Sequence, residues 1–412
     1  MAKKKDISAQ ADKPLFSGHI PRLLSYLPQG SVMPRAEERY TGQEWVYFGT
    51  NNYWPESTLE LVQNTAPLQR SAHTLAQLIA GHGIRFFKRD GETEVIEARD
   101  KLQELLEHTT EEDFLYKLAL DIAIFNAPFG TIRRAAGGDI VRLDHMDVSR
   151  MRSGEIVKET GEPAFYYWSS NWRKRSTHER YKEVKIPRYR KGEVTGIIEA
   201  FYGKTYAPGS AGDVYALPWW LGCKNACEVW AKVDAYNQTQ IDTGFAPGTH
   251  IHTFTNKSES ELKKYDDAVI RAFGGVRGEG VWHTFSEPGD NMAPQVTVIP
   301  RGNHAGELDE IRDGAERVIY NSYGMPAILM GVDTKTGMDG ASSAIQQAQV
   351  QLDRLLVIPK QQLITKLLTR IMNDIGFKDV WDAKIDAISL VSPEQDQDLS
   401  RMATMAAMTV DE

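Results

Sequence analysis

Three histidines are the first candidates for metal chemistry in this sequence. His250 and His252 are two residues apart on a predicted strand, so they share one face of it, and His283 lies on a nearby predicted strand. No carboxylate or thiol completes a zinc ligand set at the usual spacing. We therefore interpret the three as surface histidines, with a zinc site as the alternative.

The two cysteines, Cys223 and Cys227, are four residues apart in a predicted helix. That spacing places both side chains on one helix face, where they point the same way and not at each other. We interpret them as reduced thiols that pack in a core. A metal pair is the alternative, but the sequence offers no further cysteine and no histidine close by.

Two other features would suit work on nucleotides or nucleic acids. Asp144 and Asp147 could hold the metal ion of a metal-dependent nuclease, although acidic pairs near strand ends are common as turn residues. The glycine-rich stretch 274–280 lacks the Gly-Lys-Ser/Thr ending of a phosphate-binding loop, which predicts a mobile connection, and no Walker motif occurs elsewhere. We predict no catalytic residue, no cofactor and no metal.

A basic stretch at residues 173–191 is the best candidate for contact with nucleic acid, because it interleaves cationic residues with Tyr181 and Tyr189. Glu179 and Glu183 interrupt the positive charge, and the alternation is typical of strands with one face in water. We favour a solvated hairpin over a nucleic-acid surface. The residues of this possible basic patch are Arg173, Lys174, Arg175, Arg188, Arg190 and Lys191.

Composition limits the class of protein. The chain has 412 residues, of which 41% are hydrophobic and 25% charged, as in ordinary globular proteins. Its net charge of -8 argues against tight binding of nucleic acid over the whole surface, since such binding needs many Lys/Arg–phosphate pairs. The apolar runs are shorter than the roughly 20 residues that span a bilayer. The basic start leads into polar residues, so we expect a soluble chain that is not exported.

The candidate residues of the first half require an α+β arrangement to position them. Helical periodicity covers residues 57–80, 92–107 and 109–125, and Thr110 with Asp113 forms a start similar to a capping box. Strands follow and helices do not alternate with them, which predicts α+β and not α/β. The predicted strands are 130–134, 139–143, 164–168, 180–186 and 196–201.

In the second half, predicted helices at 219–243 and 307–323 flank a small α/β insertion. A loop with an apolar tip at 328–330 and a long helix at 343–374 follow. Pro359 lies inside that helix and predicts a kink and not a stop, since the apolar period resumes after it. The stripe is Ile345, Leu352, Leu355, Ile364, Leu367, Leu368 and Ile371. The insertion has strands at 250–254, 281–285 and 295–299 and a helix at 258–273; a strand at 387–391 and a helix at 399–408 end the chain.

Three motifs in order resemble the HK97-like portal proteins of tailed bacteriophages. Residues 323–331 read Tyr-Gly-Met-Pro-Ala-Ile-Leu-Met-Gly, which is similar to the family signature (F/Y)-G-V-P-P-x-L-L-G. Residues 355–359 resemble the family's apolar run into a mid-helix proline, and residues 114–143 resemble its helix, turn and strands. The sequence departs from the family at Met325 and Ala327, and it lacks the usual glycine before Asn126.

The likeness covers most of the chain from about residue 59, and it implies a portal fold with a wing, a two-helix stem, a small α/β clip and a tunnel loop. A crown would be short or missing, because the chain stops near where relatives often continue. The implied parts are a flexible N-terminal arm (1–40), the wing (41–217), the first stem helix (218–244), the clip (245–305), the second stem helix (306–323), the tunnel loop (324–342), the long kinked helix of the wing (343–375) and a C-terminal wing or crown remnant (376–412).

The resemblance also implies a function without catalysis. The chain would form a ring-shaped homo-oligomer, a dodecamer in the family, at one capsid vertex of the virion after assembly in the host cytoplasm. Double-stranded DNA would be packaged and ejected through it without sequence specificity. Its partners would be the terminase, the major capsid or scaffold protein and a head–tail connector, with no membrane. The alternatives are another head–tail connector protein, which is typically much shorter, and the metal-dependent nuclease.

The apolar tip of the loop has a physical interpretation in such a channel. Each Lys or Arg that binds a phosphate adds affinity that must be broken at every step of DNA movement, whereas apolar side chains can touch DNA of any sequence and let it slide. The alternative is that the tip fills the core of one subunit. The residues expected to face DNA are Pro326, Ala327, Ile328, Leu329 and Met330.

Overall fold

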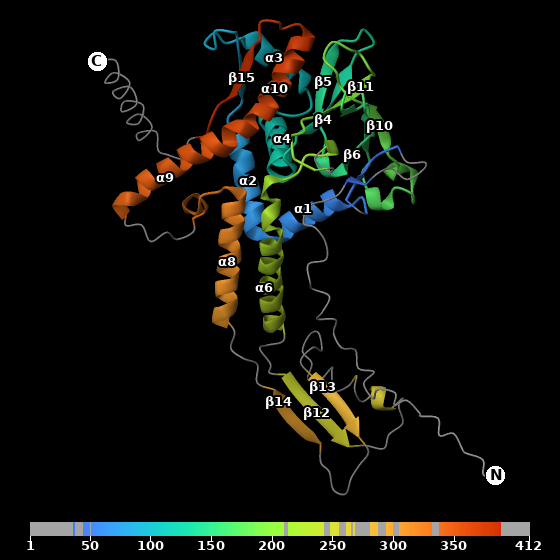
Figure 1. The fold of residues 1–412 in the computed structure, drawn as a ribbon, viewed down its shortest axis with the longest axis vertical. Helices are drawn as coiled ribbons and strands as arrows, with labels where there is room; N and C mark the ends of the chain where they lie inside the picture. The colour runs from blue at the N-terminus through green and yellow to red at the C-terminus, as the bar shows by residue number, and fades with distance from the viewer. Residues whose placement is uncertain are drawn as a thin grey trace, which may run out of the picture. The chain divides into compact units, whose positions relative to one another are not determined.

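The computed structural model describes residues 36–37, 44–49, 51–209, 213–242, 248–254, 261–264, 267, 281–286, 294–299, 305–331 and 338–388. All of them belong to one compact unit, residues 34–412. Helices and mainly antiparallel sheets occupy separate stretches of the chain, so the α+β class predicted from the sequence is confirmed (Figure 1). Within these residues, no helix is long and apolar enough to cross a membrane.

Four helices open the larger part of the fold. Thr110 caps the fourth, since its hydroxyl accepts a bond from the Asp113 N–H at 3.1 Å, as the sequence predicts. The expected single helix at 57–80 is wrong, because the chain is extended at Thr65 and Pro67 falls in the first turn of a new helix. The four are α1 (Trp54–Asn64), α2 (Ala66–Ala80), α3 (Ile96–Leu105) and α4 (Glu111–Phe125).

Two three-stranded antiparallel sheets follow, with the strand orders β11-β4-β5 and β10-β9-β6. Close packing in the first sheet requires glycine at position 130, where a Cβ would lie 2.4 Å from the Phe201 ring and 2.5 Å from the Asp144 carbonyl oxygen. The strands agree with those predicted, except that residues 179–181 form a short 3-10 helix, η4. The bounds are β4 (Phe129–Arg134), β5 (Ile140–His145), β6 (Met151–Ser153), β9 (Phe165–Trp168), β10 (Val184–Pro187) and β11 (Ile198–Tyr202). Two smaller pairs are β1 (Ala36–Glu37) with β2 (Tyr47–Phe48) and β7 (Ile156–Val157) with β8 (Glu162–Pro163).

A hairpin of two long helices leaves this body of helices and sheets (Figure 1). The short 3-10 helix η5 (Trp219–Cys223) leads into α6 (Lys224–Asp242), and α8 (Ala305–Tyr323) returns antiparallel beside it. Between them in sequence lies a three-stranded sheet of order β13-β12-β14, as predicted, built from β12 (Gly248–Phe254), β13 (Val281–Ser286) and β14 (Gln295–Ile299). Of the helix expected at 258–273, only residues 261–264 and 267 are described, and they are helical.

The long helix predicted at 343–374 consists of three segments. These are α9 (Met338–Leu352), the π-helical segment η7 (Asp353–Val357) and α10 (Ile358–Ile375), and they run in different directions on the two sides of η7 (Figure 1). The π segment ends just before Pro359, which lies in the first turn of α10. The expected apolar stripe is wrong at Leu355, which is 79% exposed, because a π turn adds a residue and shifts the phase of the helix.

The body has one main hydrophobic core, which includes residues of α2, α4, the sheet β11-β4-β5, η5, α8 and α10. A buried ion triad fixes the end of α10 to this sheet. Arg134 on β4 donates to Glu199 on β11 and to Asp374 on α10, each at 3.0 Å, and Tyr189 donates to the same Asp374 oxygen at 3.2 Å.

The last strand, β15 (Asp382–Ile385), pairs with β3 (Ile84–Phe87), so the strand predicted at 387–391 is placed too late. Its alternation of buried Ala383 and Ile385 with exposed neighbours was the relevant signal. The helix expected at 399–408 lies outside the described residues.

Candidate functional site

The base of the helical hairpin is where distant parts of the chain meet. The last carbonyl groups of α4 have no partner within the helix, as at any helix end. The Tyr323 hydroxyl, at the end of α8, donates to the Ala123 carbonyl oxygen at 2.7 Å. The Trp220 indole, in η5, lies 3.3 Å from the same oxygen and 3.2 Å from that of Ile124. The two arms of the hairpin are therefore both bonded to the C-terminus of α4.

Asn126 completes this helix end and links it to α10. It adopts the left-handed conformation at the C-cap of α4, and its amide donates to the Leu217 carbonyl oxygen at 3.0 Å. Its side-chain oxygen accepts a bond from the Lys360 ammonium, which also lies 4.2 Å from the centre of the Trp219 ring. We call Asn126, Trp219, Trp220, Tyr323 and Lys360 the hairpin-base cluster.

Lys360 is the unusual member of the hairpin-base cluster. Among the described residues, no carboxylate forms an ion pair with it, and burial lowers the pKa of its ammonium to about 8. An amide oxygen and an indole face stabilise the cation only partly. The Lys360 ammonium therefore loses its proton at a lower pH than an ordinary lysine side chain does.

The segment 326–330, expected to face DNA, is a short 3-10 helix, η6 (Ala327–Met330), that follows the hairpin directly. Met330 is 1% exposed and Leu329 packs on the main core, while contact of this segment with DNA stays a prediction. Pro326, Ala327 and Ile328 are half-buried. Of the remaining residues of the predicted loop, 332–337 lie outside the described residues. Residues 338–342 form the start of α9.

The basic stretch is folded onto carboxylates and aromatic rings. Arg173 pairs with Glu60 at 3.2 Å and lies over the Tyr53 ring, while Arg175 pairs with Glu183 at 3.1 Å and lies 4.5 Å from the centre of the Trp45 ring. Arg188 pairs with Glu162, and Arg190 approaches Glu193 at 3.6 Å. Lys174 and Lys191 are exposed. The arginines already have partners within the chain, which favours the solvated surface over a nucleic-acid surface.

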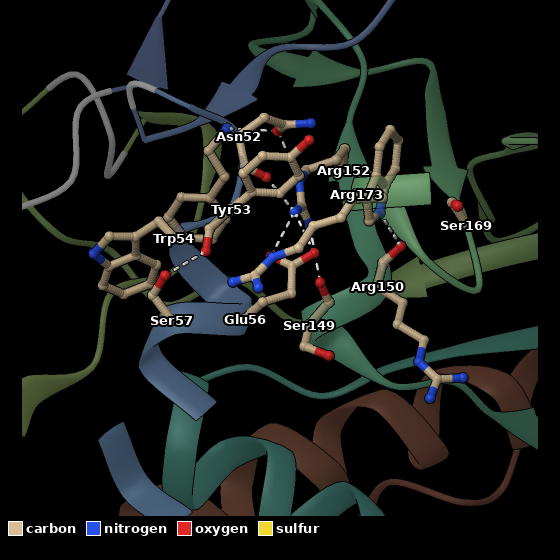
Figure 2. Close-up of polar contacts among 12 residues, drawn as sticks. Asn52, Tyr53, Trp54, Glu56, Ser57, Ser149, Arg150, Arg152, Ser169 and Arg173 are labelled. Carbon is tan, nitrogen blue, oxygen red and sulfur yellow. Dashed lines mark hydrogen bonds and ion pairs between the residues drawn. The ribbon is translucent and has the colours of Figure 1, made fainter. Parts of the chain in front are cut away.

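A fully buried arginine lies beside this stretch, and sequence reasoning missed it. Arg152, on β6, is 0% exposed, and its side chain reaches the start of α1 (Figure 2). It donates to the Glu56 carboxylate at 2.9 and 3.0 Å and to Asn52 Oδ1 at 2.7 Å, and it lies 4.8 Å from the centre of the Trp172 ring. Burial lowers the pKa of Arg152 and raises that of Glu56, and each charge opposes the shift of the other. No sequence pattern distinguishes Arg152 from its exposed neighbours.

The acidic candidates for metal chemistry have structural partners. Asp144 pairs with Arg142 at 2.6 Å and with Arg133 at 3.2 Å. Asp147 caps a 3-10 turn, η2 (Val148–Arg150), by accepting from the Ser149 N–H at 2.8 Å. Within the described residues, no group of three or more His, Cys, Asp or Glu side chains is placed to hold a metal ion.

The histidine and cysteine candidates are also engaged. His250 and His252 both contact the Thr284 hydroxyl, at 2.8 and 2.6 Å, and the side chain of His283 lies outside the described residues. Cys223 and Cys227 are buried in the main core with their sulfur atoms 3.8 Å apart, as core packing predicts. The glycine-rich stretch 274–280 is outside the described residues.

Comparisons with known proteins identify the fold. No model of a known protein family matches the chain, and no curated protein is significantly similar. A chain from the neck of an empty gene transfer agent particle, computed with C6 symmetry, is 15% identical, with a TM-score of 0.52 over 85% of this chain and 90% of that one. A chain from the neck of the native particle, computed with C12 symmetry, is 15% identical, with a TM-score of 0.50 over 85% of this chain and 89% of that one. An HK97 family phage portal protein from Corynebacterium diphtheriae is 13% identical, with a TM-score of 0.46 over 80% of this chain and 94% of that one.

This chain therefore has the fold of chains from particle necks.

Removing one partner of the buried Arg152–Glu56 pair tests its contribution to stability. We expect Arg152→Met to lower the free energy of unfolding by about 3–5 kcal/mol, because it leaves the Glu56 carboxylate without the guanidinium that pairs with it. The matched control Arg173→Met breaks the exposed pair with Glu60 and should lower it by about 0–1 kcal/mol. Denaturant unfolding measures both; equal losses would contradict the assignment. Glu56→Leu added to Arg152→Met should recover part of the loss.

The lowered pKa of Lys360 predicts a dependence of stability on pH. Between about pH 8 and 10.5 the unfolded chain binds more protons at this lysine than the folded chain, so the free energy of unfolding rises as pH rises through this window. We expect Lys360→Met to remove this rise, and Lys366→Met, at an exposed position of the same helix, to keep it. Urea unfolding at several pH values measures this rise. If the free energy of unfolding of Lys360→Met rises with pH as it does in the parent chain, Lys360 is not its source.

Proposed function

We propose that this chain is a portal subunit, copies of which form a ring at one capsid vertex through which double-stranded DNA is packaged and ejected. The observation that carries the proposal is the fold shared over 85% of the chain with chains from particle necks, one of them computed with C12 symmetry. The portal signature at residues 323–331 supports it independently, because it falls where α8 joins η6.

The parts of the fold take roles in this proposal. The body formed by the first four helices and the two sheets is the wing, and α10 closes its core. The hairpin of α6 and α8 is the stem, and the sheet β13-β12-β14 is the clip. The tunnel loop is the stretch from η6 to α9, and the long kinked helix is α9, η7 and α10 with Pro359 at its bend.

The charge of the stem supports a conduit through which DNA moves freely. Helix α8 carries five acidic residues, Glu307, Asp309, Glu310, Asp313 and Glu316, against the two basic residues Arg312 and Arg317. A lining of this charge adds no phosphate affinity that would have to be broken at each step. In the basic stretch, Arg173, Arg175 and Arg188 are paired with carboxylates of the wing, which weakens this stretch as a competing DNA site.

Among the described residues of the proposed tunnel loop, the half-buried Pro326, Ala327 and Ile328 are placed to meet DNA. Leu329 and Met330 pack on the main core and so anchor the C-terminal end of this segment. Gly331, with a φ of 71°, lets the chain turn away after this anchor. We propose that the anchored end sets the position of the loop, and that apolar contact allows DNA of any sequence to slide.

The partners in this proposal are further copies of the chain, the terminase, the major capsid or scaffold protein and a head–tail connector. A chain of this kind needs no catalytic centre, since the ATP chemistry of packaging belongs to the terminase. The acidic pair Asp144 and Asp147 is bonded to neighbouring groups of the same chain, so no observation favours the nuclease.

Electron microscopy of the purified chain tests the proposal. We expect rings with a central hole, because a repeated interface between two different faces closes when its rotation is a whole fraction of a turn. Mass photometry should give a ring mass that is a multiple of the 46.3 kDa subunit. A chain that stays monomeric at high concentration would contradict it.

Replacing Ile328 by Ser tests the role of the segment. We expect rings to form as before, because Ile328 is only half-buried, and the DNA retained by particles assembled with the variant to fall severalfold. The control Ile96→Ser changes an isoleucine on α3 that is 61% exposed, and it should leave retention unchanged. Equal DNA retention in the two variants would show that Ile328 does not act on DNA.

A further inference from the structure

Strand β5 is the outer strand of the sheet β11-β4-β5, and among the described residues no further strand pairs with it. The Met146 N–H, just after β5, donates to the Phe129 carbonyl oxygen on β4 at 3.1 Å. Bonded residues alternate along an antiparallel pair, so Asp144 also bonds to β4. Leu143 and His145, at the alternate positions, therefore turn their N–H and C=O groups to the outer edge, where another strand can pair with them.

A groove of about 180 Å³ lies at this edge, between β5 and the start of α4. Helices α3 and α4 both pack against β5, but they leave this space open. One side of the groove is formed by residues 142–145 of β5 and the other by Thr109 and Lys117, and the buried Phe114 and Leu143 give it an apolar lining. An extended chain in the groove would therefore lie against both the strand edge and an apolar surface.

The charges around the groove favour an acidic occupant. Among the residues that line it, Asp144 is the only carboxylate, and it is already paired with Arg142 at 2.6 Å and with Arg133 at 3.2 Å. Lys117 pairs with Asp113 at 2.5 Å, but both side chains are nearly half exposed, and an exposed pair of this kind is weak enough to exchange for another. The basic side chains that line the groove are His108, Lys117, Arg142 and His145.

We propose that this groove binds an extended acidic segment of another protein, which pairs with the outer edge of β5 as a fourth strand of the sheet. Main-chain bonds to Leu143 and His145 supply affinity for any extended chain, and Arg142 and Lys117 select acidic side chains. Successive side chains of a strand alternate between the two faces of a sheet, so the segment that fits best has an acidic residue at every second position. All the groups involved belong to one chain, and the inference does not depend on ring formation.

A fluorescein-labelled peptide of alternating glutamate and valine is the probe, since valine favours the extended conformation. We expect fluorescence anisotropy to show saturable binding of this peptide to the purified chain at neutral pH. The same peptide with lysine in place of glutamate should bind at least about tenfold more weakly, because it places like charges next to Arg142 and Lys117. If the glutamate peptide shows no saturable binding, or if the two peptides bind equally, the proposal is wrong.

Arg142→Gln and Arg133→Gln are a matched pair of variants. The two arginines are cross-strand partners and both pair with Asp144, but only Arg142 lines the groove. We expect Arg142→Gln to raise the Kd of the glutamate peptide about threefold or more, and Arg133→Gln to leave it unchanged. Equal values of Kd in the two variants would place the peptide outside the groove and overturn the proposal.

Hydrogen exchange, read at single amides, tests the strand pairing itself. The bound glutamate peptide should slow exchange at the Leu143 and His145 amides, which turn away from β4, and leave the Asp144 amide as it was. Binding without this protection overturns the pairing. Protection of the same two amides in the assembled chain without peptide would show that a second copy covers the edge, and binding of a single-stranded oligonucleotide in place of the peptide would show a nucleic-acid groove; either result overturns the proposal.

Discussion

The rest of the structure depends on how the C-terminal carbonyl groups of α4 are satisfied. A buried helix end cannot leave these groups without partners, because each unpaired group costs about 1–3 kcal/mol. Here their donors are the Trp220 indole and the Tyr323 hydroxyl, which belong to the two arms of the hairpin. The hairpin is therefore not an appendage of the body. Its base supplies the donors that the helix at the centre of the body lacks, and neither arm can shift without exposing them.

This arrangement gives charge two separate roles in the molecule. In the body, Arg152 is buried and paired with Glu56, and Arg134 is buried and paired with Glu199 and Asp374. They hold strands and helices in place and have little positive potential left for a partner. On α8 the charges are exposed and mostly acidic. A net charge of -8 is thus compatible with a protein that handles DNA, since a conduit requires weak contact with phosphate and not strong binding.

The sequence predicts the elements of this fold better than their contacts. The Thr110 cap and the hairpin of β4 and β5 follow from local patterns and are found as expected. The break at Thr65 was missed because the apolar period continues through Pro67, and the exposure of Leu355 was missed because a π turn is not visible as a change of period over so few residues. The roles of Lys360 and Arg152 could not be predicted from the sequence. Both residues are distinguished by burial against partners that lie far away along the chain, 234 positions for Lys360 and Asn126 and 100 positions for Arg152 and Asn52.

The hairpin-base cluster also constrains where the molecule can move. Lys360, in the first turn of α10, touches Asn126 and Trp219, and α10 itself is fixed to the sheet through Asp374 at its other end. On the far side of η7, α9 packs against η6, and Gln349 of α9 donates to the Ile388 carbonyl oxygen at 3.2 Å. The π segment has widened backbone geometry and poorer hydrogen bonding than an α-helix. A change in the direction of α9 would therefore be absorbed at η7, while α10 and the base of the hairpin keep their places.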